Sequence, residues 1–364
     1  MSPRTLLVVV LVVLLGGGVA YWLSRAPEPS ETVVNDPERP DVAPTAPDEA
    51  NPRPSTPGQG PTPPTPTEAE RATGRVVARF GWGGGPNQLG RNTPDEANPE
   101  APMSFAPGPN GSTYVLDQVN GRVLRMGPDG EVLGTTNLDQ VAPQDLAVAA
   151  DGTVAVLDRL ADRNVAVISP EGEVLGRLPL EGDLLEEAGG VTAVIVDGED
   201  VYAEREHGPL VHIGDVHGTP ASARHEIPGR PSRDGSLYLL AALVDQMAGR
   251  LIVNAIDRDS GEHRFTRQLQ ALMAIREILL LDTDGQGVVY LAIAGAPNPE
   301  HMEFEEVHLV CLSATDGHTL GTAILPGNMD ADETMRQLAV QPGGGVLYGV
   351  RSESGMAFQQ YDCR

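Results

Sequence analysis

From Arg75 onward, short runs of Val, Leu and Ile alternate with clusters of Gly, Asp and Pro. This alternation is typical of antiparallel strands that are joined by tight turns. Two different patterns precede it: an uncharged apolar run over residues 6–23, and a polar, proline-rich segment over residues 26–74. The chain is therefore predicted to have three parts, with bounds 1–25, 26–74 and 75–364.

The strand-rich part repeats itself. The segment from Pro102 to Gly134 and the segment from Pro143 to Gly176 share the same order of features. Each begins with Pro and two further residues before an apolar residue and Ala, passes through Asn-Gly or Asp-Gly and a Val-Leu-Asp run, and ends in Glu-Val-Leu-Gly. Each copy holds four apolar runs and three turns, which predicts one four-stranded blade of a β-propeller.

Weaker copies of this unit cover residues 192–227, 229–269 and 275–326. The last copy, residues 335–364, is one strand short, and the unassigned run from Arg75 to Phe80 supplies the missing strand. Pairing the first strand with the last blade closes the ring and leaves no long exposed edge. The sequence therefore predicts an all-β, six-bladed propeller, and we expect a monomer.

Residues 79–90, Arg-Phe-Gly-Trp-Gly-Gly-Gly-Pro-Asn-Gln-Leu-Gly, are followed by the Pro-x-x-apolar-Ala start and by Val-Leu-Asp with Asn-x-Arg-Val. This order resembles the NHL-repeat propellers, strongly over residues 75–180 and only in strand rhythm after that. The resemblance implies that Asp117 with Arg122, and Asp158 with Arg163, hold turns together. The second unit departs from the first, since Ala161 stands in the place of the asparagine.

The apolar run over residues 6–23 has two interpretations. As a helix it would be about 27 Å long, close to the thickness of a bilayer core. Tyr21 and Trp22 stand at its far end, where aromatic rings favour the membrane interface. This favours a single-pass anchor in the inner membrane, N-in, with the propeller in the periplasm or outside. The alternative is a signal peptide cleaved after Ala20, which would give a secreted protein.

Residues 26–74 contain 13 prolines among Glu, Asp, Thr and Ser. Such a segment cannot bury enough apolar surface to offset its ordering entropy, so it is predicted to be a disordered, semi-rigid linker. A sensor whose partner engages this linker or the anchor is one functional interpretation of the arrangement.

The charge of the chain and the motifs that it lacks exclude several classes of function. The chain has 51 acidic and 25 basic residues, all of the latter arginine, and a formal charge of −26. Phosphate backbones are repelled by such a surface, so we expect no nucleic-acid partner. The absence of lysine from the sequence excludes Schiff-base chemistry, and no intact motif of a nucleophile elbow, a zinc protease or a phosphate-binding loop occurs. We therefore predict no catalytic residues and favour a protein- or ligand-binding scaffold.

Propellers usually bind ligands around the channel, on the face where the innermost strands begin. The repeat alignment places polar side chains there, and these are the candidate ligand- or partner-binding residues: Ser104, Gln144, Asp145, Arg276, Glu277, Arg336 and Gln337. Two carboxylates, Asp145 and Glu277, together with amide or hydroxyl oxygens, could hold Ca²⁺; no other cofactor is expected. The alternative function is a metal-dependent propeller enzyme of the lactonase or lyase type, with its site in the channel.

Cys311 and Cys363 fall in the third strands of the last two blades. In an exported protein both thiols could be oxidised together. However, equivalent strands of neighbouring blades are expected to lie too far apart for a bridge. The sequence is compatible with a disulfide and with two buried free thiols, and it does not decide between them.

Overall fold

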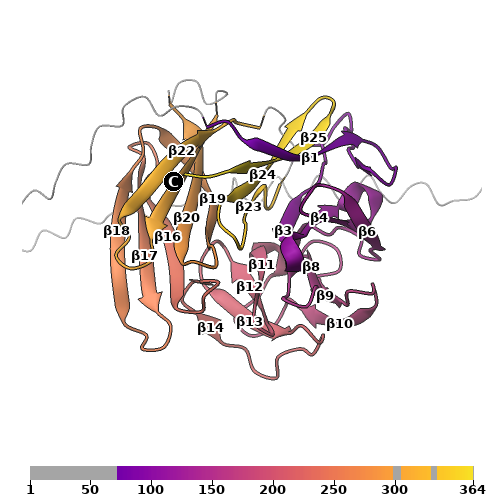
Figure 1. Ribbon diagram of the computed structural model, residues 1–364. Coiled ribbons are helices and arrows are strands. Elements are labelled where there is room, and N and C mark those ends of the chain that lie inside the picture. Colours follow the sequence, from indigo (N-terminus) through magenta and orange to yellow (C-terminus); the bar gives the residue numbers. More distant parts are fainter. Residues whose placement is uncertain (1–71, 298–304, 329–333, 364) are drawn as a thin grey trace, which may run out of the picture. The chain divides into compact units, whose positions relative to one another are not determined.

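The computed structural model describes residues 72–297, 305–328 and 334–363. Their strands form six sheets, antiparallel except for one short parallel pair in the last, and the sheets follow one another around a ring (Figure 1). The predicted all-β, six-bladed propeller is therefore confirmed. Blade 1 is β3–β6, blade 2 is β7–β10, blade 3 is β11–β14, blade 4 is β15–β18, blade 5 is β19–β22, and blade 6 is β23–β25 with β1 and β2.

The strands of blades 1 to 3 are β3 (Ser104–Pro107), β4 (Thr113–Asp117), β5 (Arg122–Met126), β6 (Val132–Asn137), β7 (Asp145–Val148), β8 (Val154–Asp158), β9 (Asn164–Ile168), β10 (Val174–Pro179), β11 (Val191–Asp197), β12 (Asp200–Arg205), β13 (Leu210–Asp215) and β14 (Glu226–Ile227). The strands of blades 4 to 6 are β15 (Arg230–Pro231), β16 (Leu237–Asp245), β17 (Arg250–Asp257), β18 (His263–Gln270), β19 (Ala274–Thr283), β20 (Val288–Ala296), β21 (Glu306–Ser313), β22 (Thr319–Leu325), β23 (Leu338–Val340), β24 (Val346–Ser352), β25 (Gly355–Tyr361), β1 (Arg75–Trp82) and β2 (Gln88–Leu89).

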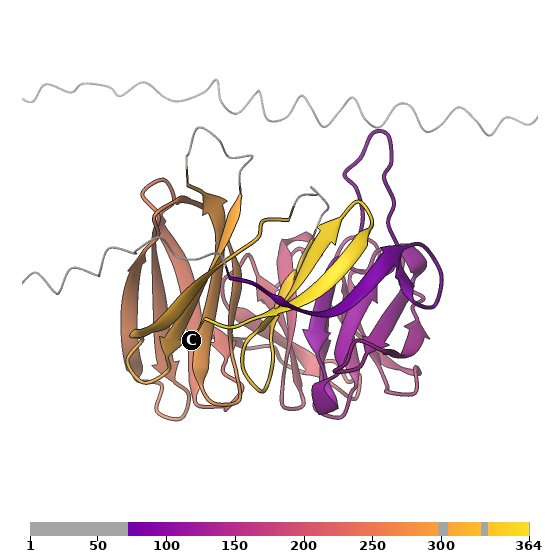
Figure 2. The same cartoon turned by 45° about the horizontal axis from the view of Figure 1, so that its top comes forward.

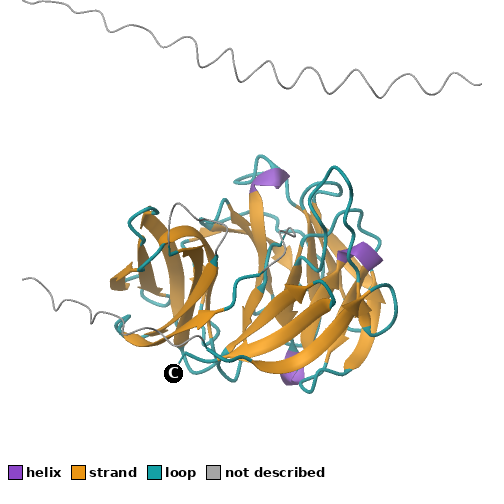
Figure 3. Cartoon of the chain, turned by 90° about the horizontal axis from the view of Figure 1, so that it is seen from above, coloured by secondary structure: helices purple, strands orange, loops and turns teal. Residues whose placement is uncertain are grey.

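Helical structure in the described residues is limited to three 3-10 turns, η1 (Pro109–Gly111), η2 (Gln118–Asn120) and η3 (Ala188–Gly190), visible in Figure 3. Within these residues, no helix has the length and apolar character needed to cross a membrane. The predicted anchor or signal peptide, and the predicted linker up to residue 71, lie outside the described residues.

The ring closes as the sequence predicts. Strand β1 pairs antiparallel with β25, from Arg75 opposite Gln360 to Gly81 opposite Gly355. Figure 2 shows this junction, with the first strand in indigo beside the last in yellow. The pairing covers the edge that β25 would otherwise expose, so the two ends of the propeller domain hold each other.

Apolar side chains fill the spaces between neighbouring blades. Val, Leu, Ile and Ala supply most of this core, as the low aromatic content requires. At the closure, the ring of Phe358 packs edge-on against Phe80 and Phe105, with centroid distances of 6.0 and 5.1 Å. Phe358 therefore joins the closing strand and blade 1 through aromatic contacts.

The turn-binding role of Asp117 and Arg122 is present in blade 1. Asp117 accepts a hydrogen bond from Nε of Arg122 at 2.8 Å, and a second from the backbone N–H of Gly90 at 2.8 Å. The second unit differs. Asp158 accepts from the backbone of Ala161 instead, and Arg163 pairs with Glu181 at 3.0 Å.

The Asp158–Arg163 prediction is therefore wrong. Arg163 adopts a left-handed conformation with φ of 53°, and its guanidinium lies on the surface beside Glu181. Without the asparagine of the first unit, backbone N–H groups satisfy Asp158 in the place of the arginine.

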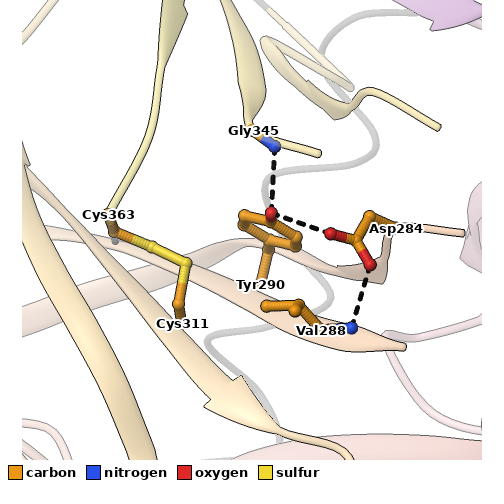
Figure 4. The surroundings of a disulfide bond; sticks show 6 residues. All are labelled: Asp284, Val288, Tyr290, Cys311, Gly345 and Cys363. Atoms are coloured by element: carbon orange, nitrogen blue, oxygen red, sulfur yellow. Dashed lines mark hydrogen bonds between the residues drawn. A yellow bond between two sulfur atoms is a disulfide. The ribbon is translucent and has the colours of Figure 1, made fainter. Parts of the chain in front are cut away.

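Cys311 and Cys363 form a disulfide, with their Cα atoms 6.1 Å apart (Figure 4). The expectation that equivalent strands of neighbouring blades lie too far apart is wrong here. Cys363 follows the end of β25, where the chain runs back toward β21, and both cysteines are buried in the core between blades 5 and 6. Beside the bridge, Tyr290 Oη donates to Asp284 at 3.1 Å and accepts from the N–H of Gly345 at 2.9 Å, which links the same two blades.

Candidate functional site

The innermost strands begin on one face of the ring, which we call the starting face. Asp145, the first residue of β7, is buried there with 1% of its surface exposed. Its Oδ1 accepts from Ser104 Oγ at 2.5 Å, and its Oδ2 accepts from the backbone N–H of Val194 at 2.9 Å and from Arg336 Nη2 at 2.8 Å. Arg336 Nη2 also donates to the carbonyl of Val194 at 3.0 Å.

This network ties four blades together, because Ser104, Asp145 and Val194 lie in β3, β7 and β11 and Arg336 precedes β23. Both oxygens of Asp145 already accept hydrogen bonds. A cation at this carboxylate would have to displace Arg336 or Ser104, so these residues do not fit a Ca²⁺ site as they stand. In the part of the chain that is described, no group of three or more His, Cys, Asp or Glu could hold a metal ion. The Ca²⁺ hypothesis stays a prediction.

The two candidate glutamines hold nearby segments. Gln144 Oε1 accepts from the backbone N–H of Arg159 at 3.0 Å, and Gln337 Oε1 accepts from Asn328 Nδ2 at 2.7 Å. Each amide oxygen thus anchors a neighbouring segment to the start of an inner strand.

A cavity of about 420 Å³ opens between blades 3, 4 and 5. It lies on the starting face, since its walls come from the beginnings of β15 and β19 and from the ends of the antiparallel strands β12 and β16. Its volume is within the usual range of small-ligand sites. The residues that line it are Glu204, His207, Gly208, Arg230, Leu239, Leu240, Ala241, Ala242, Leu243, Arg276, Glu277, Ile278 and Leu281.

The cavity exists because the innermost strand of blade 4 is very short. Strand β15 has two residues, whereas β16 has nine. The pairing reaches only Arg230 opposite Leu239 and Pro231 opposite Tyr238. Beyond Leu239, β16 continues without an inner neighbour in its sheet. Five successive residues of β16, from Leu239 to Leu243, line the cavity. Because side chains alternate along a strand, such a continuous run means that the edge of the strand faces the cavity.

Charged side chains in the cavity wall are paired with each other. Arg230 binds Glu204 through two hydrogen bonds of 2.8 and 3.0 Å, and Thr192 Oγ1 donates to the same carboxylate at 3.0 Å. Burial raises the pKa of Glu204, but the charge and hydrogen bonds of Arg230 outweigh burial and hold that pKa below its usual value. The pair is therefore ionised at neutral pH.

Arg276 forms a second paired group. It contacts Glu277 at 2.6 Å and Glu305 at 2.5 Å. Burial lowers the pKa of Arg276, but its two carboxylate partners raise it further, so the net shift is upward. Burial and the nearby Glu277 raise the pKa of Glu305, although Arg276 opposes this shift. Each arginine in the wall is thus paired, Arg230 with one carboxylate and Arg276 with two, which leaves the second group with one negative charge.

The seven predicted residues therefore separate into groups. Arg276 and Glu277 line the cavity, whereas Ser104 and Arg336 both bind Asp145 in a separate network that joins blades 1, 2, 3 and 6. Among the described residues, no hydrogen bond joins Asp145 to Glu277. Sequence reasoning missed Glu204, Arg230 and residues 240–243. Two features of the sequence could have indicated the cavity. One is the small Ala-Ala pair within an otherwise bulky apolar strand. The other is the Pro-Gly and Arg-Pro steps at 228–231, which interrupt the inner strand.

No protein-family model matches this sequence, and no curated protein matches it. Solved structures with similar folds include virginiamycin B lyase from Staphylococcus aureus, at 11% identity over 76% of this chain and 88% of that chain, with a TM-score of 0.42. A member of the DUF4221 family from Bacteroides vulgatus is 11% identical over 81% of this chain and 98% of that chain, with a TM-score of 0.46. The C-terminal WD40 domain of Sif2 is 12% identical over 75% and 84%, with a TM-score of 0.39. The NHL resemblance is not confirmed by a family model.

Proposed function

We propose that this protein is an exported, membrane-tethered β-propeller that acts as a binding scaffold in the cell envelope. Its ligand site is the cavity between blades 3, 4 and 5. The observation that carries the proposal is the cavity itself: an apolar interior with paired charges in its wall, on a closed ring. Concave sites with a largely apolar lining and a few polar groups are the usual form of ligand sites in proteins.

The sequence supports export and attachment to the membrane, the second part of the proposal. The apolar run over residues 6–23 and the proline-rich segment after it suit an anchor and a spacer. The disulfide between Cys311 and Cys363 agrees with folding in an oxidising compartment. The acidic net charge argues against a nucleic-acid partner.

Photo-crosslinking in cells tests the ligand site. Val244 is 54% exposed and directly follows the cavity residues of β16. A photoreactive amino acid placed at Val244 in the full chain is expected to trap the bound molecule. Adding Ala242→Phe, which fills the cavity, should abolish that adduct. The matched control is Leu320→Ser, a change of an exposed side chain on the outermost strand of blade 5. Equal adduct yield with and without Ala242→Phe would contradict the proposed site.

A further inference from the structure

The backbone of β16 offers hydrogen-bonding groups to the cavity. Ser232 donates its N–H to the carbonyl of Leu237, and Arg230 pairs with Leu239, so residues 237 and 239 direct their backbone groups toward the β15 side. These directions alternate along a strand, so Ala241 and Leu243 point the same way. Among the residues that the structure describes, no group pairs with the N–H or C=O of Ala241 or Leu243 on that side.

The two N–H groups and two C=O groups of Ala241 and Leu243 thus face a partly apolar space, with the spacing that a neighbouring strand requires. Exposed backbone groups of this kind are the template for an added strand. The pairing of β15 sets the geometry: an added chain that continues its direction would run antiparallel to β16 and lie opposite residues 240–243. Four residues of extended chain span about 13 Å.

The side chains that line the cavity further restrict which ligands can bind. Ala241 and Ala242 are small and point to opposite faces of β16, which leaves room for a larger side chain on either face of an added strand. Leu240, Leu243 and Ile278 give these side chains apolar surroundings. Glu204 balances the charge of Arg230, whereas Glu277 and Glu305 both pair with Arg276 and leave that group with one negative charge, so the wall offers no unpaired cation to the ligand. A complementary ligand therefore carries no negative charge where it is buried.

We infer that the ligand is an extended peptide segment with small or branched apolar side chains and no negative charge in its buried part, which binds as the missing innermost strand of blade 4. This inference rests on the proposed function and names its ligand class. It assigns recognition to the backbone of Ala241 and Leu243 and side-chain fit to the two alanines.

The test uses capped pentapeptides, acetylated and amidated so that no terminal charge enters the cavity. Three probes alternate threonine with valine, leucine or alanine, and binding to the purified full chain is measured by calorimetry. At least one probe should bind. N-methylation at single positions of the best probe should weaken binding at least tenfold at every second amide, because only alternate N–H groups of an antiparallel strand face β16. Equal effects at all positions, or none, would overturn strand pairing.

Two protein variants separate pairing from side-chain fit. Ala241→Pro removes a backbone N–H that β17 does not use, so the propeller should keep its melting behaviour while peptide affinity falls at least tenfold. Ala242→Phe should reduce affinity by filling the space, and Leu320→Ser should leave it unchanged. Undiminished affinity in Ala241→Pro would overturn the inference. If no capped peptide binds while Ala242→Phe still abolishes the crosslink at Val244, the peptide class is wrong and the proposed function stands; if the crosslink is also unaffected, both fail.

Discussion

At the residue scale, carboxylates of similar appearance in the sequence have very different surroundings. Asp145 is buried and accepts three hydrogen bonds from three other blades. Asp139 lies on the surface, with 64% of its side chain exposed, and binds Arg177 at 2.6 Å. An exposed pair contributes little to stability because water competes for both partners, whereas a buried carboxylate that is removed leaves its donors unsatisfied.

Asp145→Ala is therefore expected to lower the free energy of unfolding by about 3 kcal/mol, because Arg336 and the N–H of Val194 lose their acceptor away from water. Asp139→Ala should cost less than about 1 kcal/mol. Urea unfolding of both variants measures the difference. Similar losses in the two variants would show that the network around Asp145 does not hold the blades together.

Glu204 gives the cavity a dependence on pH. Its folded-state pKa lies below the ordinary value of 4.5, so the unfolded chain takes up a proton more readily than the folded chain. The stabilisation by Arg230 is thus present above about pH 4.5 and is lost as the pH falls through the lowered pKa. Urea unfolding of Glu204→Gln between pH 7 and pH 3 should show a smaller loss with acid than the wild type. Glu353→Gln, at an exposed position, is the control. An unchanged slope in Glu204→Gln would contradict this role.

At the scale of elements, the sequence was informative where the repeat is regular. The four strands of blades 1 to 5, the number of blades and closure by the segment from Arg75 to Phe80 all follow from copies that keep their turns and apolar runs. The short strand β2 adds a fifth strand to blade 6, which the repeat does not predict. The cavity arises where the copies are weakest, because the inner strand of blade 4 is reduced to Arg230 and Pro231. A missing strand leaves no pattern of its own. The pairing of Arg230 with Glu204 joins different blades, which a single sequence does not reveal.

The disulfide is an element-scale constraint between blades 5 and 6. Its cysteines are 52 residues apart in sequence, and closing a loop of that size in the unfolded chain corresponds to about 4 kcal/mol in the chain-entropy description. Reduction of the wild type should therefore lower its urea midpoint clearly. The double variant Cys311→Ser, Cys363→Ser should have the lower urea midpoint from the outset, and reductant should not change it. A wild-type midpoint that reductant does not move would contradict the predicted contribution.

At the scale of the whole molecule, one prediction about export and membrane attachment depends on three parts of the chain: the first 74 residues, the ring and the cysteine pair. If residues 6–23 insert N-in and stay uncleaved, the propeller is exported and remains bound to the membrane. A tag after residue 364 should then be digested by protease in spheroplasts, and the protein should resist extraction by carbonate. Cleavage after Ala20 would instead give a soluble mature chain that begins at Tyr21, which mass spectrometry distinguishes.

The same cysteines report the compartment. Disulfides persist in oxidising compartments and are rare in the cytosol, so Cys311 and Cys363 should resist maleimide labelling in the exported protein and should label in a chain that lacks residues 6–23. Labelling is measured after denaturation, because both cysteines are buried in the folded core. Agreement between thiol state and protease access would tie the fold to its location, since one measurement depends on blades 5 and 6 and the other on the first 25 residues. A wild-type chain with free thiols and a protected tag would contradict export and would remove the membrane from the proposed function.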